Sequence, residues 1–102
     1  MTLHRGEVYA YTPVLPRPGQ SLSRLVVSAD ALNASAIPVV LGLQVVDRDP
    51  GSLLSVHLED HGWAVVTTIE QVMRRRLGEL AGSISGDEQR SVDNALRAAM
   101  DL

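Results

Sequence analysis

Apolar residues alternate with polar ones or run together in short blocks over most of the chain, a pattern typical of β-strands. Four blocks predict strands over residues 5–11, 36–46, 53–59 and 63–72. A fifth, Leu25 to Val27, places three apolar residues in succession and predicts a strand covered on both faces. Within the most hydrophobic block, Gly42 indicates a bulge or a close backbone approach.

One segment near the end of the chain has helical spacing. Its apolar stripe consists of Val92, Ala95, Leu96, Ala99 and Met100. Ser85 and Glu88 have the spacing of a capping box, which predicts that the helix begins directly after Ser85. The stripe packs against the sheet or faces a second subunit. Residues 73–80 read as a short helical turn or a strand end.

A long connection separates the first two strands. Residues 12–23 contain three prolines and a glycine, which excludes a helix and indicates a functional or mobile loop. Arg24 opens the next strand, so the loop would lie over its guanidinium. Arginine binds phosphate bidentately and keeps its charge, so Arg24 is the predicted phosphate contact. Arg17, at the centre of the loop, is a second phosphate contact or an ordinary solvated side chain.

Charge narrows the binding partners. The net charge is −3, and all nine basic residues are arginine. Phosphate contacts normally require a basic face, so RNA binding would depend on a local cluster of arginines. The triplet at residues 74–76 is such a cluster or a solvated face.

Several classes of site are not expected. The chain has no cysteine, which excludes disulfides and thiolate metal sites. His4, His57 and His61 lack metal-ligand spacing, so each is expected in a structural surface role, and no metal or cofactor is predicted. No apolar run approaches roughly 18 residues and no signal-peptide core is present, so a soluble, cytoplasmic protein is expected, without membrane association.

The order of elements predicts one domain over residues 1–102, mainly β with one α-helix. We expect a small, SH3-like, curved antiparallel sheet or barrel of about five to seven strands, with the C-terminal helix covering an open side.

Four segments carry a family resemblance. Residues 5–9 and 24–28, separated by the loop, resemble the opening of the MazF/PemK-type toxins, with its RGE(I/V) strand and its arginine-led second strand. Residues 76–80 and 94–96 are similar to the family's R-L-G-x-(L/I) segment and its terminal helix. The resemblance covers nearly the whole chain.

This resemblance implies the toxin of a toxin–antitoxin pair: a homodimeric, metal-independent endoribonuclease. In such an enzyme the 2′-OH of single-stranded RNA attacks the adjacent phosphate. Arg24 matches the family's catalytic arginine and would stabilise the charged transition state, or also donate a proton. A cognate antitoxin is the expected partner, with a disordered tail that crosses the dimer groove and displaces residues 13–23.

The sequence departs from the family pattern at several positions. The family's catalytic threonine is matched by Val45, and the proline after the arginine by Leu25. An arginine and an aspartate found in the fifth strand of some relatives match Val65 and Thr67 when no gap is allowed.

Two polar residues near Val45 could replace the missing threonine hydroxyl, namely Gln44 and Asp47. Together with Arg24 they are the predicted catalytic residues. The predicted RNA-binding residues are Arg17, Ser23, Thr67 and Thr68.

Two alternatives remain open. The CcdB-type poisons of DNA gyrase share the same barrel and resemble residues 8–11 and 63–68. That family engages its target through a Trp-Gly-Ile-like C-terminus, whereas this sequence ends in residues 99–102, AMDL, which argues against gyrase. The second alternative is a catalytically weakened relative that acts only by binding a partner, consistent with the loss of the threonine at Val45.

Overall fold

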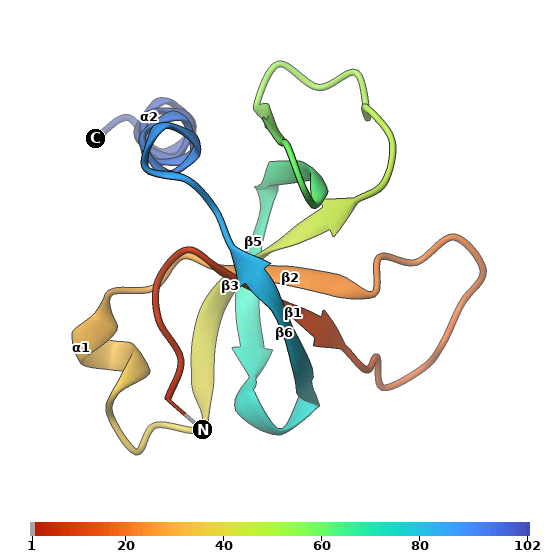
Figure 1. Ribbon diagram of the computed structural model, residues 1–102, viewed down its shortest axis with the longest axis vertical. Helices are drawn as coiled ribbons and strands as arrows, with labels where there is room; N and C mark the ends of the chain where they lie inside the picture. The colour runs from red at the N-terminus through yellow and green to blue at the C-terminus, as the bar shows by residue number, and fades with distance from the viewer. Residues whose placement is uncertain (1) are drawn as a thin grey trace.

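The computed structural model describes residues 2–102 as one antiparallel sheet with a C-terminal helix (Figure 1). The strands are β1 (Glu7–Tyr11), β2 (Ser23–Val26), β3 (Val39–Val46), β4 (Ser55–Leu58), β5 (Gly62–Met73) and β6 (Leu77–Ser83); the helices are α1 (Asp30–Asn33), the 3₁₀ turn η1 (Arg74–Arg76) and α2 (Gly86–Met100). The sheet has the strand order β4-β5-β3-β2-β1-β6. The predicted mainly β fold with a terminal helix is confirmed. Of the two predicted forms, curved sheet or barrel, the structure has the sheet, which does not close into a barrel.

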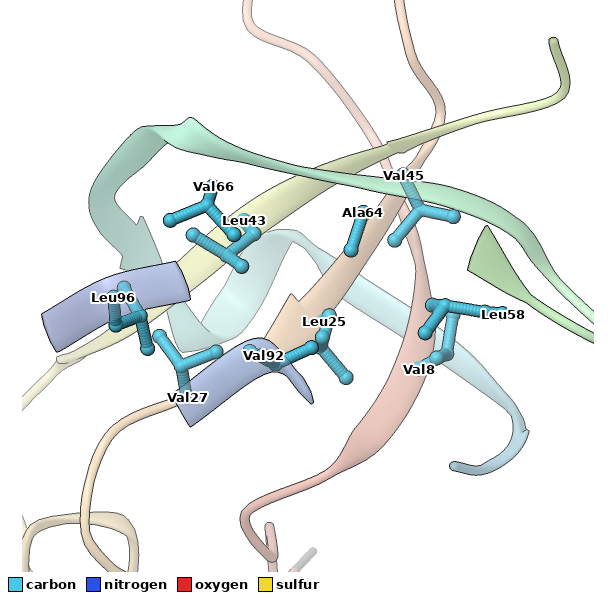
Figure 2. Close-up of a cluster of buried hydrophobic side chains, with 10 residues drawn as sticks. All are labelled: Val8, Leu25, Val27, Leu43, Val45, Leu58, Ala64, Val66, Val92 and Leu96. Atoms are coloured by element: carbon cyan, nitrogen blue, oxygen red, sulfur yellow. The ribbon is translucent and has the colours of Figure 1, made fainter. Parts of the chain in front are cut away.

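The sheet buries apolar side chains on both faces. On the face covered by α2, called the helix face, ten residues form one cluster: Val8, Leu25, Val27, Leu43, Val45, Leu58, Ala64, Val66, Val92 and Leu96 (Figure 2). On the opposite face, called the Arg24 face, a smaller cluster contains Leu3, Tyr9, Val26, Val40, Val72 and Leu77. Successive strand residues point to opposite faces, so residues 25–27 divide between the two clusters, as the uninterrupted apolar run predicts.

Helix α2 begins with the predicted capping box. The Ser85 hydroxyl accepts a hydrogen bond from the Glu88 amide at 3.1 Å, and the Glu88 carboxylate accepts one from the Ser85 amide at 2.8 Å. The hydrogen bonds that the Glu88 carboxylate accepts from the Ser85 amide and from the Glu59 amide lower the pKa of Glu88 below its ordinary value. Val92 and Leu96 are buried against the sheet, whereas the last turn, with Met100, is exposed. The stripe therefore packs against the sheet over its first turns only.

The segment after β5 contains a strand that the sequence pattern did not predict. After η1, residues 77–83 form the edge strand β6 beside β1. Their sequence, LGELAGS, has two glycines and little alternation, which explains why the pattern indicated only a turn or a strand end. None of the helices within residues 2–102 is long and apolar enough to cross a membrane.

The arginine triplet before β6 is not one patch. The Arg74 guanidinium donates hydrogen bonds to the backbone oxygens of Leu32, Asn33 and Ile37, with 2.7 Å to Asn33. These contacts satisfy carbonyls at the end of α1, where a helix leaves them without internal partners. Arg74 therefore anchors α1 to the sheet, and of the triplet only Arg75 is exposed.

A large bulge interrupts the pairing of β3 with β5. Gly42 pairs with Glu70 and Gln44 pairs with Val65, so β3 advances two residues while β5 advances five. Strand β5 thus carries three extra residues, the difference between five and two. Thr68 fills the gap: its hydroxyl accepts the Gln44 amide at 2.9 Å and donates to the Val65 carbonyl at 2.6 Å. The bulge or close approach predicted at Gly42 is confirmed.

Candidate active site

Arg24 lies in β2 on the Arg24 face, and only 3% of its side chain is exposed. Its Nε donates to a carboxylate oxygen of Glu70 at 2.9 Å. Its Nη1 donates to the backbone oxygens of Ser21 at 3.1 Å and Ser23 at 2.9 Å. The ring of Tyr11 lies 3.9 Å from the central carbon of the guanidinium. The charge is therefore held by a carboxylate, two carbonyls and an aromatic face.

Glu70 is a candidate site residue that the sequence pattern did not reveal. Its side chain is 40% exposed, so the carboxylate is open to solvent while it binds the buried guanidinium. Gly42 lies in β3, between β2, which carries Arg24, and β5, which carries Glu70. A Cβ at Gly42 would come within 2.9 Å of Val72 Cγ2 and 3.8 Å of Arg24 Cβ. The pairing of Glu70 with Gly42 of β3, which has no side chain between Glu70 and Arg24, is the feature that could have indicated this contact.

Glu70 lies beyond the bulge of β5. The ungapped match places the family's acidic position at Thr67, whereas the structure places a carboxylate at Arg24 three residues farther along β5. Val65, matched to the family's arginine, pairs with Gln44 across the sheet, and Thr67 is exposed.

Two predicted residues lie together beside Arg24. Gln44 is the direct partner of Arg24 across β2 and β3, so both side chains share the Arg24 face. Gln44 and Arg17, with loop residues 18–20, line a cavity of about 360 Å³. The long loop that carries Arg17 projects away from α1 and α2 in Figure 1. The structure thus places the Gln44 amide beside Arg24, and Arg17 in the same cavity as Gln44.

Asp47 and Ser23 belong to a different cavity. They line a space of about 340 Å³ together with His61 and Ser21. Side chains alternate along a strand, so Ser23 and Val45 point to the helix face while Arg24 points away from it. The Ser23 side chain therefore lies on the other face of the sheet from the guanidinium, although its backbone oxygen accepts from Nη1, and Asp47 follows the end of β3.

The remaining predicted positions have structural surroundings. Val45, matched to the family threonine, is buried in the apolar cluster of the helix face. The hydroxyl of Thr68 is used within the bulge. Within residues 2–102, no group of three or more His, Asp or Glu side chains is arranged to hold a metal ion. The chemistry that the described site offers is therefore that of the Arg24–Glu70 pair, with Gln44 and Arg17 beside it.

Comparisons with known proteins give similarity in structure only. No protein-family model matches the sequence, and no curated protein sequence matches it. An endoribonuclease solved with its cognate antitoxin, from a mycobacterial species, aligns over 99% of this chain and 95% of its own, with a TM-score of 0.81 and 22% identity. The MazE–MazF complex of Deinococcus radiodurans aligns over 100% and 99%, with a TM-score of 0.80 and 19% identity.

A third structure, the toxin MazF-mt6 of Mycobacterium tuberculosis, aligns over 94% of this chain and 97% of its own, with a TM-score of 0.72 and 13% identity. The chain therefore has the fold of bacterial toxin endoribonucleases. Among these, the fold is that of MazF, as the sequence resemblance predicts.

Proposed function

We propose that the chain is the toxin of a toxin–antitoxin pair and acts as an endoribonuclease on single-stranded RNA. The observation that carries the proposal is the Arg24–Glu70 pair, in which a buried cation and a solvent-open carboxylate lie 2.9 Å apart. Cleavage of RNA by its own 2′-OH needs these two groups: a base for the hydroxyl and a cation for the charge that develops on the phosphate. The MazF fold of the chain supports the same reaction class.

In the proposed reaction the Glu70 carboxylate takes the proton of the 2′-OH, and the 2′-oxygen bonds to the adjacent phosphorus. The bond from phosphorus to the 5′-oxygen of the next nucleotide breaks. That oxygen takes a proton from water, because arginine keeps its own proton at physiological pH. The hydroxide that remains takes the proton from Glu70, which restores the carboxylate. The products are a 2′,3′-cyclic phosphate and a 5′-hydroxyl. Arg24 stabilises the charge on the pentavalent phosphate, and no metal ion takes part.

The neighbouring cavity would hold the RNA strand. Arg17 supplies a positive charge for a flanking phosphate, and Gln44 supplies donors and an acceptor next to Arg24. Thr67, exposed on the bulge of β5, remains a predicted RNA contact. Asp47 and Ser23 line a second cavity, which shares residues 19 and 20 with the first, so a role for them requires RNA that extends from one cavity into the other.

The partners proposed from the resemblance are a second copy of the chain and a cognate antitoxin. Two of the similar structures are described as complexes with an antitoxin or with MazE, which supports the second partner. Light scattering tests the first, since a homodimer has twice the chain mass of 11.0 kDa. The cytoplasm is the compartment where cleavage of cellular mRNA would take place.

Cleavage of a long, mixed-sequence single-stranded RNA in EDTA tests the function. We expect the wild-type chain to give discrete fragments that end in 2′,3′-cyclic phosphate. Arg24→Ala should lose about 100-fold or more in rate, as when a transition-state donor is removed. Glu70→Gln should lose a similar factor, because the amide cannot accept the proton.

Arg90→Ala is the matched control, since Arg90 lies on α2 with 74% of its side chain exposed and is expected to be dispensable. Circular dichroism establishes that each variant is folded. If Arg24→Ala is unfolded, Arg24→Met replaces it, because methionine preserves more of the side-chain volume. RNA left intact by the folded wild-type dimer would contradict the nuclease. Fragments that persist in Arg24→Met would show that a different group does the chemistry.

One second function has a specific observation in its favour. The Arg24 side chain is only 3% exposed, and Ser21 at the end of the long loop binds its guanidinium, as expected for an inactive state with a closed site. A relative that only binds its antitoxin would keep this state permanently. Capture of an antitoxin by a chain that leaves RNA intact would favour that function. No comparable observation favours a gyrase poison.

A further inference from the structure

The aromatic ring that covers Arg24 comes from Tyr11, the last residue of β1. Tyr9, two residues earlier, is the direct cross-strand partner of Arg24, so the Tyr11 ring reaches the guanidinium diagonally. A separation of 3.9 Å between the ring centre and the central guanidinium carbon is van der Waals contact and well within the range of a cation–π interaction. The central carbon of the guanidinium therefore lies against the face of the ring.

The ring itself is held in place. The Tyr11 amide donates to the Leu22 carbonyl at 2.8 Å, and Tyr11 pairs with Leu77 in β6. Its side chain packs against the apolar cluster of the Arg24 face. These contacts from the loop end, β6 and the cluster restrict movement of the ring.

The hydrogen bonds fix two of the three guanidinium nitrogens. Nε is bound to Glu70, and Nη1 is bound to Ser21 and Ser23. Within residues 2–102, Nη2 has no hydrogen bond to a protein atom and is therefore the nitrogen left for a phosphate oxygen. Guanidinium donors point within the plane of the group, so whatever sets the plane also sets the direction of the Nη2 donors.

We infer that Tyr11 is a positioning residue for RNA cleavage, and that its ring face sets the plane in which Arg24 presents Nη2 to the scissile phosphodiester. The inference rests on the proposed function. The ring performs this role and the phenolic hydroxyl does not, because the contact is made at the ring centre. Donors aimed in advance at the developing charge stabilise the transition state more than the bound substrate, so the effect falls on kcat.

The test compares Tyr11→Phe with Tyr11→Ile, which keeps strand propensity but removes the ring. The substrate is an RNA oligonucleotide spanning a cleavage position mapped with the wild-type chain. Binding is measured with the same oligonucleotide carrying a 2′-deoxy residue at that position. We expect Tyr11→Phe to keep kcat within about twofold and Tyr11→Ile to lose about 10-fold to 100-fold, since a small misplacement of a catalytic group costs that much. Binding of the deoxy oligonucleotide should change by less than about threefold, a split typical of lost transition-state stabilisation.

Trp63→Ile is the matched control, because it also replaces an aromatic residue in a strand with an aliphatic one. The centre of the Trp63 ring lies 4.6 Å from the centre of the His57 ring. Trp63→Ile should leave kcat unchanged. The resonance of the Arg24 Nε–H, identified by its loss in Arg24→Met, gives a readout independent of catalysis. The chemical shift of this proton should be unchanged in Tyr11→Phe. It should change in Tyr11→Ile, because the ring current is lost.

If Tyr11→Ile does not fold, Tyr11→Met is the replacement. Equal kcat in wild type and a folded, ring-free variant would overturn the inference and leave the nuclease intact. A Tyr11→Phe variant as slow as Tyr11→Ile would also overturn it, because the hydroxyl would then be the group required. RNA left intact by the wild type overturns the proposed function and the inference with it.

Discussion

The two faces of the sheet bury different kinds of side chain. The helix face holds ten apolar residues in one cluster, closed by Val92 and Leu96 of α2 (Figure 2). The Arg24 face holds a cluster of six, and beside it lie the buried charges of Arg24 and Glu7. Burying a charge is unfavourable unless it is paired and hydrogen-bonded. The helix face is thus suited to stabilise the fold, and the Arg24 face holds groups suited to chemistry.

The difference extends to how each face is closed. A helix that covers a face by apolar contact is favoured by the removal of side chains from water. On the Arg24 face no helix covers the guanidinium, which is enclosed by Tyr11, Glu70 and the end of the loop. Ser21 belongs to the loop, whereas Tyr11 and Glu70 belong to strands of the sheet. We expect substitutions on the two faces to separate stability from activity.

The largest effect is expected on the helix face. Leu43 is fully buried in β3, and Leu43→Ala removes three carbon atoms from the centre of the cluster. The free energy of unfolding should fall by about 2–5 kcal/mol because a cavity remains. Urea denaturation measures the change, and RNA cleavage at low temperature should persist in the folded fraction. A loss below about 1 kcal/mol would mean that this face does not dominate stability.

The next effect depends on pH and concerns a buried hydroxyl of the Arg24 face. Burial, with the hydrogen bond of 2.8 Å to Glu7 and the charge of that carboxylate, raises the pKa of Tyr9 to about 12. In the unfolded chain the Tyr9 phenol has its ordinary pKa of about 10, so folding favours the neutral form of this phenol. The resulting stability is fully present below about pH 10 and is lost as the pH rises through about 12. The loss should reach about 3 kcal/mol.

Denaturation at a series of alkaline pH values checks this expectation against Tyr9→Phe, which has no phenol at that position. The difference in stability between the two chains should change only between the two pKa values. Absorbance titration of the folded protein gives the second readout, because Tyr11 is the only other tyrosine. A phenol of Tyr9 that ionises near pH 10 in the folded chain would contradict the buried hydrogen bond.

A smaller, asymmetric effect is expected from the ion pair. Glu70→Gln leaves the buried Arg24 without its carboxylate and should cost about 1.5–3 kcal/mol, the range for a hydrogen bond to a charged group. Arg24→Met removes the buried charge, and Glu70 becomes solvated because it is 40% exposed. Stability should then change by less than about 1 kcal/mol or increase. An Arg24→Met variant as unstable as Leu43→Ala would show that the pair holds the fold together.

The sequence allowed most of the helix face to be predicted. Its strands follow apolar runs, and the start of α2 follows from Ser85 and Glu88, because these signals are local. The edge strand β6 was not predictable in this way, since its seven residues lack alternation and are strands only through pairing with β1. The exposed last turn of α2 depends on how far the sheet extends, which no local pattern encodes.

The site was predictable in part, for a related reason. Arg24 follows from its place at the start of a buried strand, and Arg17 and Gln44 come together with it in space. Glu70 depends on the bulge of β5, whose three extra residues shift every later side chain relative to β3. Tyr11 reaches Arg24 by a diagonal contact that depends on strand order. Both are consequences of pairing between strands distant in sequence.

The smallest effect is expected at the end of α2. Asp101 follows the helix with φ 56° and ψ 46°, the one non-glycine residue among 2–102 with positive φ. Its amide and that of Leu102 both donate to the Arg97 carbonyl, the pattern that glycine favours at this position. Asp101→Gly removes the left-handed strain and a negative charge from the helix C-terminus, and should raise stability by about 1 kcal/mol. Asp101→Asn should give only part of this gain, because it removes the charge and keeps the strain.

Urea denaturation measures both variants, and the rate of RNA cleavage is followed alongside. Helix α2 covers only the helix face, so the rate should stay at the wild-type value while stability rises. An Asp101→Gly variant that is more stable but slower would show that the end of α2 is coupled to the Arg24 face. A change in stability on the helix face would then alter activity on the Arg24 face, and the two properties could not be separated by substitutions on the two faces.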